Sequence, residues 1–249
     1  MSSSRGFGID VGGSGIKGGH VDLDAGTLIG ERLRIATPEP STPEAVAQVA
    51  ARIVTAFDWH GRLGVTLPCV VKHGTVLTAA NVDPGWIGID GPAVLSKEIG
   101  EPVRVLNDAD AAGLAEMRYG AGRDVSGVVV LLTFGTGIGS AVFSDGELVP
   151  NTEFGHLQLD GMDAEDSAAA SVKDELDLSW REWTPRVSRY LLALEGLIWP
   201  DLIIVGGGVS KQADRWLPLL RNRTTVVAAQ LRNDAGIVGA ALAAHTPSS

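Results

Sequence analysis

The chain has 249 residues and a formal charge of −10; 32 residues are glycine and only one is cysteine. A hydrophobic fraction of 45% excludes a disordered chain, the absence of a three-residue glycine period excludes collagen, and a lone cysteine excludes an intrachain disulfide framework. The acidic charge argues against nucleic-acid binding. Since neither a secretory leader nor a run of about 20 apolar residues is visible, we expect a cytoplasmic protein with no membrane partner.

The first half of the chain predicts a meander of strands followed by alternating helices and strands. Alternating apolar residues around polar and glycine-rich turns predict strands at 7–11, 16–23 and 28–35. Thr42, Pro43 and Glu44 form a helix start, and apolar residues then recur at helical spacing as far as Phe57. Short apolar runs follow at 63–67, 69–71, 76–77 and 103–106, with a loop at 81–86 and a helix at about 110–119.

The opening pattern of strand, glycine turn, strand, polar turn and strand recurs about 120 residues later, from position 128, and suggests an internal duplication. The rest of the second half predicts strands at 202–205 and 225–229 and helices at 165–176, 184–198, 211–220 and 235–244. We expect two lobes, 1–108 and 109–249, with the terminal helix of 235–249 packing on the first.

The glycine turn at 12–15 contains a literal G-x-G-x-x-G, at 13–18, directly after a predicted strand. A dinucleotide fold would need a helix to begin there, but a period-2 segment follows, so that interpretation fails. A glycine hairpin can still cradle phosphate with its backbone N–H groups. Asp10 could then hold Mg²⁺, directly or through water, and Lys17 could neutralise charge. The alternative is a structural hairpin; two such hairpins and the turn at 206–208 favour phosphate binding.

Polar residues at two further places are candidates for chemistry. Asn107 and Asp108 end a predicted buried strand, where the ligand sites of α/β sheets lie, so a carboxylate there could deprotonate a hydroxyl. The alternative is a cap for the helix that follows. Glu153 and His156 could bind hydroxyls or a metal, although no other histidine or cysteine lies nearby to complete a metal site.

These motifs together resemble the ROK family of sugar kinases in the actin-like ATPase superfamily, and within it the bacterial glucokinases that use polyphosphate. The residues that carry the resemblance are 8–17 (GIDVGGSGIK), 81–86 (NVDPGW), 107–113 (NDADAAG), 135–140 (GTGIGS), 153–156 (EFGH) and 206–210 (GGGVS). They occur in the family's order along essentially the whole chain.

The resemblance implies a two-lobed, actin-like (ribonuclease H-like) α/β fold with duplicated halves that close on a sugar. It implies that Asp108 is the catalytic base, which accepts the proton of the 6-hydroxyl of glucose, and that Mg²⁺ binds at Asp10. The sugar-binding positions it implies are Asn81, Asn107, Asp108, Glu153, His156 and Glu165. The phosphate-binding positions are Asp10, Gly12, Gly13, Ser14, Gly15, Lys17, Thr133, Gly135, Thr136, Gly137, Gly139, Gly207 and Gly208.

The chain departs from the family pattern in two places. Most members follow the Glu-x-Gly-His motif with cysteines that bind zinc together with the histidine. Residues 157–171 contain no cysteine, so we expect no zinc site, as in the polyphosphate subgroup. Cys69 follows Pro68 where the family usually has glycine, which suggests some cost in stability.

The resemblance implies polyphosphate or ATP as the phosphoryl donor. The two hairpins do not distinguish them, because both donors present nearly the same terminal phosphates. A long polyanion needs further basic residues, and the stretch 211–232 supplies Lys211, Arg215, Arg221, Arg223 and Arg232. The alternative for this stretch is a solvated helix face and loop. An ATP-dependent glucokinase or broader hexokinase is the main rival function. A phosphatase on the same fold and a sugar-responsive repressor are disfavoured, and a homodimer is expected from the resemblance.

Overall fold

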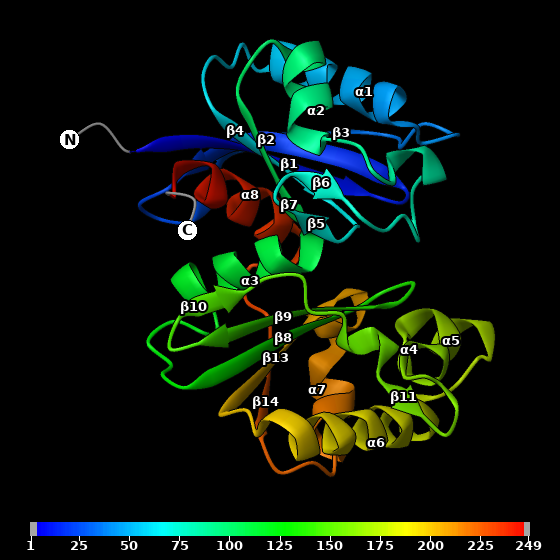
Figure 1. The fold of residues 1–249 in the computed structure, drawn as a ribbon. Helices are drawn as coiled ribbons and strands as arrows, with labels where there is room; N and C mark the ends of the chain where they lie inside the picture. The colour runs from blue at the N-terminus through cyan, green and yellow to red at the C-terminus, as the bar shows by residue number, and fades with distance from the viewer. Residues whose placement is uncertain (1–3, 247–249) are drawn as a thin grey trace. The chain divides into compact units, whose positions relative to one another are not determined.

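The computed structural model describes residues 4–246, which form two units, 4–115 with 234–246 and 116–233 (Figure 1). The sequence-based division lies at 108/109, so the structure assigns residues 109–115 to the first unit. The helix at the C-terminal end of the chain also belongs to the first unit. No helix within residues 4–246 has the length and apolar character needed to cross a membrane.

The first unit is built on a five-stranded sheet in the order β3-β2-β1-β4-β7. Its strands are β1 (Arg5–Gly12), β2 (Gly15–Asp22), β3 (Thr27–Ile35), β4 (Leu63–Leu67) and β7 (Val103–Asn107). The first three are antiparallel neighbours, and β4 and β7 are parallel to β1. The predicted meander is therefore confirmed. Because β2 follows the glycine turn as a strand, rejecting the dinucleotide interpretation was correct.

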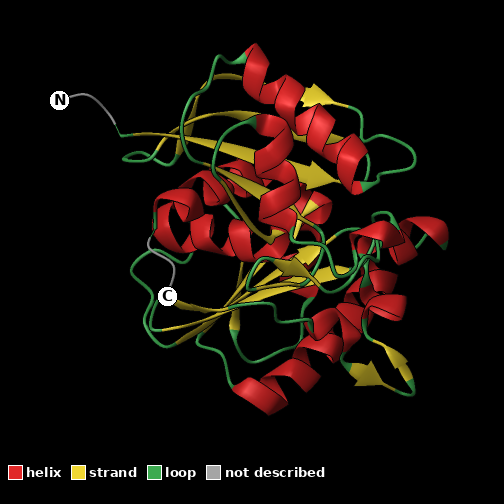
Figure 2. Ribbon diagram, turned by 45° about the horizontal axis from the view of Figure 1, so that its top comes forward, coloured by secondary structure: helices red, strands yellow, loops and turns green. Residues whose placement is uncertain are grey.

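Helices cover both faces of this sheet (Figures 1 and 2). The predicted helix is α1 (Pro43–Ala56), and the hydroxyl of its N-cap Thr42 accepts a hydrogen bond from the Ala45 N–H at 3.2 Å. The sequence analysis missed α2 (Gly91–Ile99), which Asp90 caps by accepting from the Ala93 N–H at 2.9 Å. The first unit also contains a short hairpin, β5 (Val71–Lys72) with β6 (Thr75–Val76), and the 3-10 turn Pro84–Trp86 with its buried tryptophan.

Helix α8 (Ala235–His245) packs on the opposite face so closely that three glycines have no room for a side chain. A Cβ atom on Gly8 would lie 1.9 Å from the Ile237 carbonyl oxygen, and one on Gly64 would lie 1.9 Å from that of Ala240. A Cβ on Gly239 of α8 itself would lie 1.8 Å from the carbonyl oxygen of Ala111 in α3 (Asp108–Tyr119). These glycines therefore serve packing, not ligand binding.

The second unit repeats the sheet of the first, with the order β10-β9-β8-β13-β14 and the same strand directions. Its strands are β8 (Val128–Phe134), β9 (Ile138–Ser144), β10 (Glu147–Val149), β13 (Leu202–Gly207) and β14 (Thr225–Ala228). A small hairpin of β11 (Gln158–Leu159) and β12 (Met162–Asp163) follows the 3-10 turn Phe154–His156. The matching sheets are what the repeated sequence pattern led us to expect.

The helices of the second unit differ from the sequence-based expectation in three places. Helix α6 (Trp180–Ile198) begins four residues earlier than predicted, because Ser179 and Glu182 form a capping box. The predicted helix at 165–176 is broken into α4 (Glu165–Ala168) and α5 (Ala170–Glu175) by the extended backbone of Ala169. The predicted helix at 211–220 is wrong: only α7 (Ala213–Trp216) is α-helical, between two 3-10 turns, and Pro218 has no N–H to continue it.

Candidate active site

Asp10 is held in place at the carboxyl end of β1. The Thr66 hydroxyl donates to its Oδ1 at 2.9 Å, and Lys17 Nζ, directly opposite on β2, lies 3.5 Å from its Oδ2. Thr66 is fully buried and also accepts from the Val11 N–H at 3.2 Å, so it couples the carboxylate to the sheet. A Cβ atom on Gly236 would lie 2.7 Å from Asp10 Cγ, so glycine is what lets the start of α8 approach the carboxylate. A partly exposed carboxylate near the end of a strand is a suitable ligand for Mg²⁺ that is shared with phosphate.

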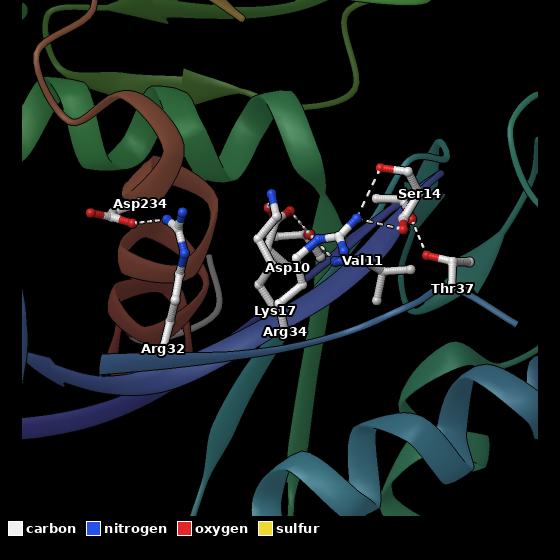
Figure 3. A network of polar contacts seen from close by, with 10 residues as sticks. Asp10, Val11, Ser14, Lys17, Arg32, Arg34, Thr37 and Asp234 are labelled. Carbon is white, nitrogen blue, oxygen red and sulfur yellow. Dashed lines mark hydrogen bonds and ion pairs between the residues drawn. The ribbon is translucent and has the colours of Figure 1, made fainter. Parts of the chain in front are cut away.

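The tip of the first hairpin is held by side chains that the sequence analysis did not single out. Arg34 of β3 donates from Nη2 to the Ser14 carbonyl oxygen at 2.7 Å and lies 3.4 Å from its hydroxyl, and the Thr37 hydroxyl donates to the Gly12 carbonyl oxygen at 2.5 Å (Figure 3). Gly13 is exposed and has open space where a side chain would stand. Since Arg34 pairs with Lys17 in the meander, the strand register could have identified it.

Asn107 and Asp108 lie where β7 ends and α3 begins. Asn107 is buried; its Oδ1 accepts from the Ala109 and Asp110 N–H groups at 2.8 and 3.0 Å, and its Nδ2 donates to the Cys69 carbonyl oxygen at 3.1 Å. The predicted cap is therefore Asn107, and this cap sets the position of the neighbouring Asp108. The Asp108 carboxylate is partly exposed and accepts from the Ala109 N–H at 2.9 Å.

Asn81 lies in the loop between β6 and the turn at Pro84–Trp86, and its side chain is exposed. This loop is anchored at Ser41: the Asp83 N–H donates to its hydroxyl at 3.2 Å, and the Trp86 indole N–H donates to its carbonyl oxygen at 3.0 Å. The predicted sugar positions of the first unit are thus one exposed amide, one buried amide and one carboxylate, all on anchored backbone.

The second hairpin joins β8 to β9. Gly135 and Thr136 are exposed at its tip. Ser171 of α5 supports this tip with two hydrogen bonds. Its backbone N–H donates to the Gly135 carbonyl oxygen at 3.0 Å, and its hydroxyl donates to the Thr136 carbonyl oxygen at 2.7 Å. Thr133 and Gly139 pair with each other across the two strands. The hairpin therefore presents its backbone at the tip, as a phosphate loop requires.

The turn after β13 lies against the end of β8. Gly207 has a φ of +79°, and a Cβ atom there would lie 2.1 Å from the Phe134 carbonyl oxygen. Both the left-handed backbone and the close approach require glycine. Gly207 and Gly208 are exposed and close in the sheet to the second hairpin, because Gly207 pairs with Phe134.

Glu165 connects the second hairpin to the Glu153–His156 segment. Its Oε2 accepts from the Ile138 N–H at 2.8 Å, and a Cβ atom on Gly137 or Gly155 would lie 2.5 or 2.8 Å from that oxygen. Its Oε1 lies 3.9 Å from His156 Nδ1. The predicted sugar contact of Glu165 stays a prediction; the hydrogen bond shows that this side chain also supports the second hairpin.

His156 is held by Asp163, a residue that the sequence analysis did not identify. The distance between His156 Nδ1 and Asp163 Oδ2 is 2.8 Å. Gln158 pairs with Asp163 in the small hairpin, and its Nε2 donates to the other oxygen of the Asp163 carboxylate. The hydrogen bond to Asp163 raises the pKa of His156. Partial burial lowers this pKa, and the charges of Glu165 and Glu153 raise it further. The pKa of Glu153 is raised by burial and by the charge of Glu165, and it is lowered by the charge of His156.

The sequence analysis considered only histidine and cysteine as partners of His156 at a metal site, but carboxylates also supply ligand atoms. One such atom from each of His156, Asp163 and Glu165 lies within 4.8 Å of the other two. A direct hydrogen bond joins the first two, and the third accepts from the Ile138 N–H. The absence of a zinc site stays a prediction.

Asp163→Asn is expected to lower the pKa of His156, because the principal group that favours its charged form is then gone. With Asp163 in place, His156 stays protonated to a higher pH than an ordinary histidine. An NMR titration of the ring measures the midpoint. The Asn variant should show a midpoint at lower pH, and an unchanged midpoint would refute the assignment. Asp160→Asn, in the exposed turn of the same small hairpin, is the control.

The arginines of the basic stretch 211–232 are exposed but differ in their partners. Arg223 stacks over Trp199, 4.0 Å from the ring centre, and its Nε lies 3.3 Å from an oxygen of the buried Glu195. Arg221 instead lines a groove of about 620 Å³ with Arg181 and Arg189 on α6. Arg221 is therefore better placed than Arg223 to meet a polyanion.

Glu195 holds the loop that follows Arg221. Burial alone would raise its pKa, but donors from Asn222, Thr224 and Arg223 outweigh burial and lower the pKa to about 2. The ionised carboxylate then contributes on the order of 3 kcal/mol to the free energy of unfolding.

This contribution is complete above pH 4.5, the ordinary pKa of the group, and is lost as the pH falls toward about 2. Glu195→Gln should therefore lower the free energy of unfolding at pH 7, and the difference from wild type should narrow on acidification. Urea unfolding between pH 7 and pH 3 measures this, with the exposed Glu98→Gln as a control. Parallel pH profiles for wild type and Glu195→Gln would contradict the assignment.

The chain is similar to known proteins both in sequence and in structure. Residues 6–175 match the model of the ROK family. The chain is 61% identical over 240 residues to polyphosphate glucokinase of Mycobacterium tuberculosis, covering 96% of this chain and 91% of that protein. It is 60% identical to the enzyme of the same name from Mycobacterium leprae, covering 97% of this chain and 75% of that protein.

Among solved structures, the inorganic polyphosphate/ATP-glucomannokinase of Arthrobacter sp. strain KM superposes with a TM-score of 0.93 at 52% identity, covering 96% of this chain and 98% of that one. A ROK family glucokinase of Streptomyces griseus, solved with glucose and AMPPNP, superposes with a TM-score of 0.80 at 27% identity, covering 97% of this chain and 99% of that one. With the family match over residues 6–175 and relatives at 60–61% identity along nearly its whole length, this chain belongs to the ROK family of sugar kinases, with their two-unit, actin-like fold.

Proposed function

We propose that this protein is a polyphosphate-dependent glucokinase, which transfers the terminal phosphoryl group of polyphosphate to the 6-hydroxyl of glucose. The observation that carries the proposal is the 61% identity to a polyphosphate glucokinase over 96% of the chain. The arrangement of polar residues within each unit supports it, because phosphoryl transfer to an alcohol needs a base, a phosphate cradle and charge neutralisation.

Asp108 is the general base in this proposal. Its carboxylate is partly exposed at the end of a central strand, and the buried cap Asn107 holds the turn on which it stands. Accepting the proton of the sugar hydroxyl as the oxygen attacks phosphorus keeps the nucleophile from becoming a cation. The hydroxyls of the sugar bind to Asn81, Asn107, Glu153, His156 and Glu165. Water cannot make this set of hydrogen bonds, so these contacts would select glucose over water as the acceptor.

The two hairpins hold the donor phosphates. Gly12, Gly13, Ser14 and Gly15 offer backbone N–H groups in the first, Thr136 and Gly137 do so at the tip of the second, and Gly207 and Gly208 lie beside it. The Gly135 N–H donates to the Gly137 carbonyl oxygen and the Ile138 N–H to Glu165, and both contacts hold the shape of that tip. Lys17 balances charge on the phosphate oxygens. Asp10 would hold Mg²⁺, which supplies Lewis-acid charge neutralisation when bound. We further propose that the protein is cytoplasmic and a homodimer, by analogy with the family.

The main alternative is an ATP-dependent glucokinase, since one structural relative is named for both donors. A coupled assay of glucose 6-phosphate formation, with long-chain polyphosphate or ATP as the donor, tests the proposal directly. A higher kcat/KM with polyphosphate supports it; activity with ATP alone supports the alternative. Mannose in place of glucose measures the breadth of sugar use, because that same relative is named a glucomannokinase.

A further inference from the structure

Three charged side chains lie in a row across β1, β2 and β3, the meander that contains the first hairpin (Figure 3). Asp10 on β1 pairs with Lys17 on β2, and Lys17 pairs with Arg34 on β3. Directly paired residues of neighbouring antiparallel strands share a face of the sheet. The row therefore crosses one face, and its third member belongs to none of the motifs that carry the family resemblance.

The guanidinium of Arg34 lies directly against the hairpin. Its Nη2 lies 2.7 Å from the carbonyl oxygen of Ser14 and 3.4 Å from the Ser14 hydroxyl. A Cβ atom on Gly15 would lie only 2.5 Å from Arg34 Nε, so the glycine is what lets the guanidinium approach. Arg34 is exposed, and these contacts leave its Nε and Nη1 donors available to a ligand.

Arg34 differs from its basic neighbours in how its charge is balanced. Lys17 Nζ lies 3.5 Å from the Asp10 carboxylate, and Arg32, two residues earlier on the same strand, forms an ion pair with Asp234. Within residues 4–246 no carboxylate forms an ion pair with Arg34, whose partner Ser14 offers only neutral oxygens. The row of three thus has a net charge of +1, and the excess positive charge is on Arg34.

We propose that Arg34 binds the phosphoryl donor and favours polyphosphate over ATP. A planar guanidinium binds two phosphate oxygens at once, which makes it suited to a continuous polyanion. Lys17 lies within strand β2 and Ser14 at the hairpin tip, so a donor chain that extends from Lys17 toward the tip meets Arg34. Polyphosphate has phosphate units to place there, whereas ATP ends in a nucleoside after three. This inference rests on the proposed function, because it names a donor contact of the same site.

The test compares Arg34→Gln, Arg34→Lys and Arg32→Gln with the wild-type chain. Gln keeps a polar side chain but carries no charge, and Lys keeps the charge without the planar group of five N–H donors. The control at position 32 removes an equivalent charge, one that a carboxylate already balances. Two measurements are made at fixed salt: calorimetric binding of long-chain inorganic polyphosphate without sugar, and KM and kcat with polyphosphate, ATP and glucose.

For Arg34→Gln we expect the Kd and KM for polyphosphate to rise about tenfold, the KM for ATP to rise less than about threefold, and the KM for glucose and kcat to stay unchanged. Arg34→Lys should recover part of the affinity, and Arg32→Gln should behave as wild type. Wild-type affinity in Arg34→Gln would overturn the proposal, as would an equal loss with both donors or an equal loss in Arg32→Gln. If the wild type phosphorylates glucose with neither donor, the proposed function fails, while the calorimetric comparison still decides the role of Arg34.

Discussion

Asp108→Asn is expected to lower kcat for glucose phosphorylation by about 10²- to 10⁴-fold, with little change in the affinity for glucose. Asparagine keeps the size and much of the hydrogen bonding of the side chain but cannot accept the proton of the sugar hydroxyl. The fold should be preserved, because the cap of α3 is Asn107, whose Oδ1 accepts from the Ala109 and Asp110 N–H groups. Steady-state kinetics and isothermal titration with glucose measure the two effects separately.

The matched control for this substitution is Asp90→Asn. Asp90 is also a carboxylate at the start of a helix in the first unit, is exposed, and accepts from the Ala93 N–H, a role that asparagine fills equally well. It should retain wild-type kcat. A kcat within a few-fold of wild type for Asp108→Asn would show that Asp108 is not the base.

Gly8→Ala is expected to destabilise the protein by about 3 kcal/mol or more, because the new methyl group would lie 1.9 Å from the Ile237 carbonyl oxygen. A backbone oxygen within α8 cannot turn aside as a flexible side chain can, so the helix must move off the sheet. In a chain of this size the loss corresponds to a fall in Tm of roughly 10 °C. Differential scanning fluorimetry and urea unfolding measure it.

Gly13→Ala is the matched control, five positions later at the exposed hairpin tip. A Cβ atom there meets nothing within 4 Å, so the Tm should stay within about 2 °C of wild type. Since Gly13 is proposed to cradle phosphate, its KM for the donor should rise instead. Equal loss of stability in both variants would refute the division of these glycines into packing and binding groups.

The strands were predictable because their signals are local. Alternating apolar residues and glycine turns lie within a few positions of one another, and the structure places strands at 5–12, 15–22 and 27–35 where the pattern predicted them. The same holds for α1, since Thr42, Pro43 and Glu44 are adjacent in sequence. Helix α2 was missed although Asp90 and Pro92 are comparable start signals, because its nine residues contain only a short apolar repeat.

The breaks in the second unit follow from tertiary contacts that no local pattern contains. The carbonyl oxygens of Ala168 and Ala169 accept from the buried Trp183 indole at 3.1 and 3.2 Å, and this helps to hold the break between α4 and α5. Trp216 lies within the segment 211–220 that was expected to be one helix, and its indole donates to the Val209 carbonyl oxygen, just before that segment, at 3.2 Å. Buried tryptophan side chains thus compete with helix propensity.

The sequence by itself determined the family, the duplicated sheets and the positions of both glycine hairpins, because each of these depends on residues that are close together in the sequence. Only the tertiary structure distinguished the uses of the glycines: Gly8, Gly64 and Gly239 make room for backbone, whereas Gly13 leaves open space. It also brought Arg34 to Ser14, Asp163 to His156 and Glu195 to Arg223. The charge balance of a side chain and the free space around a glycine depend on which residues from distant parts of the chain come into contact. Tertiary packing determines these contacts, and local sequence patterns do not.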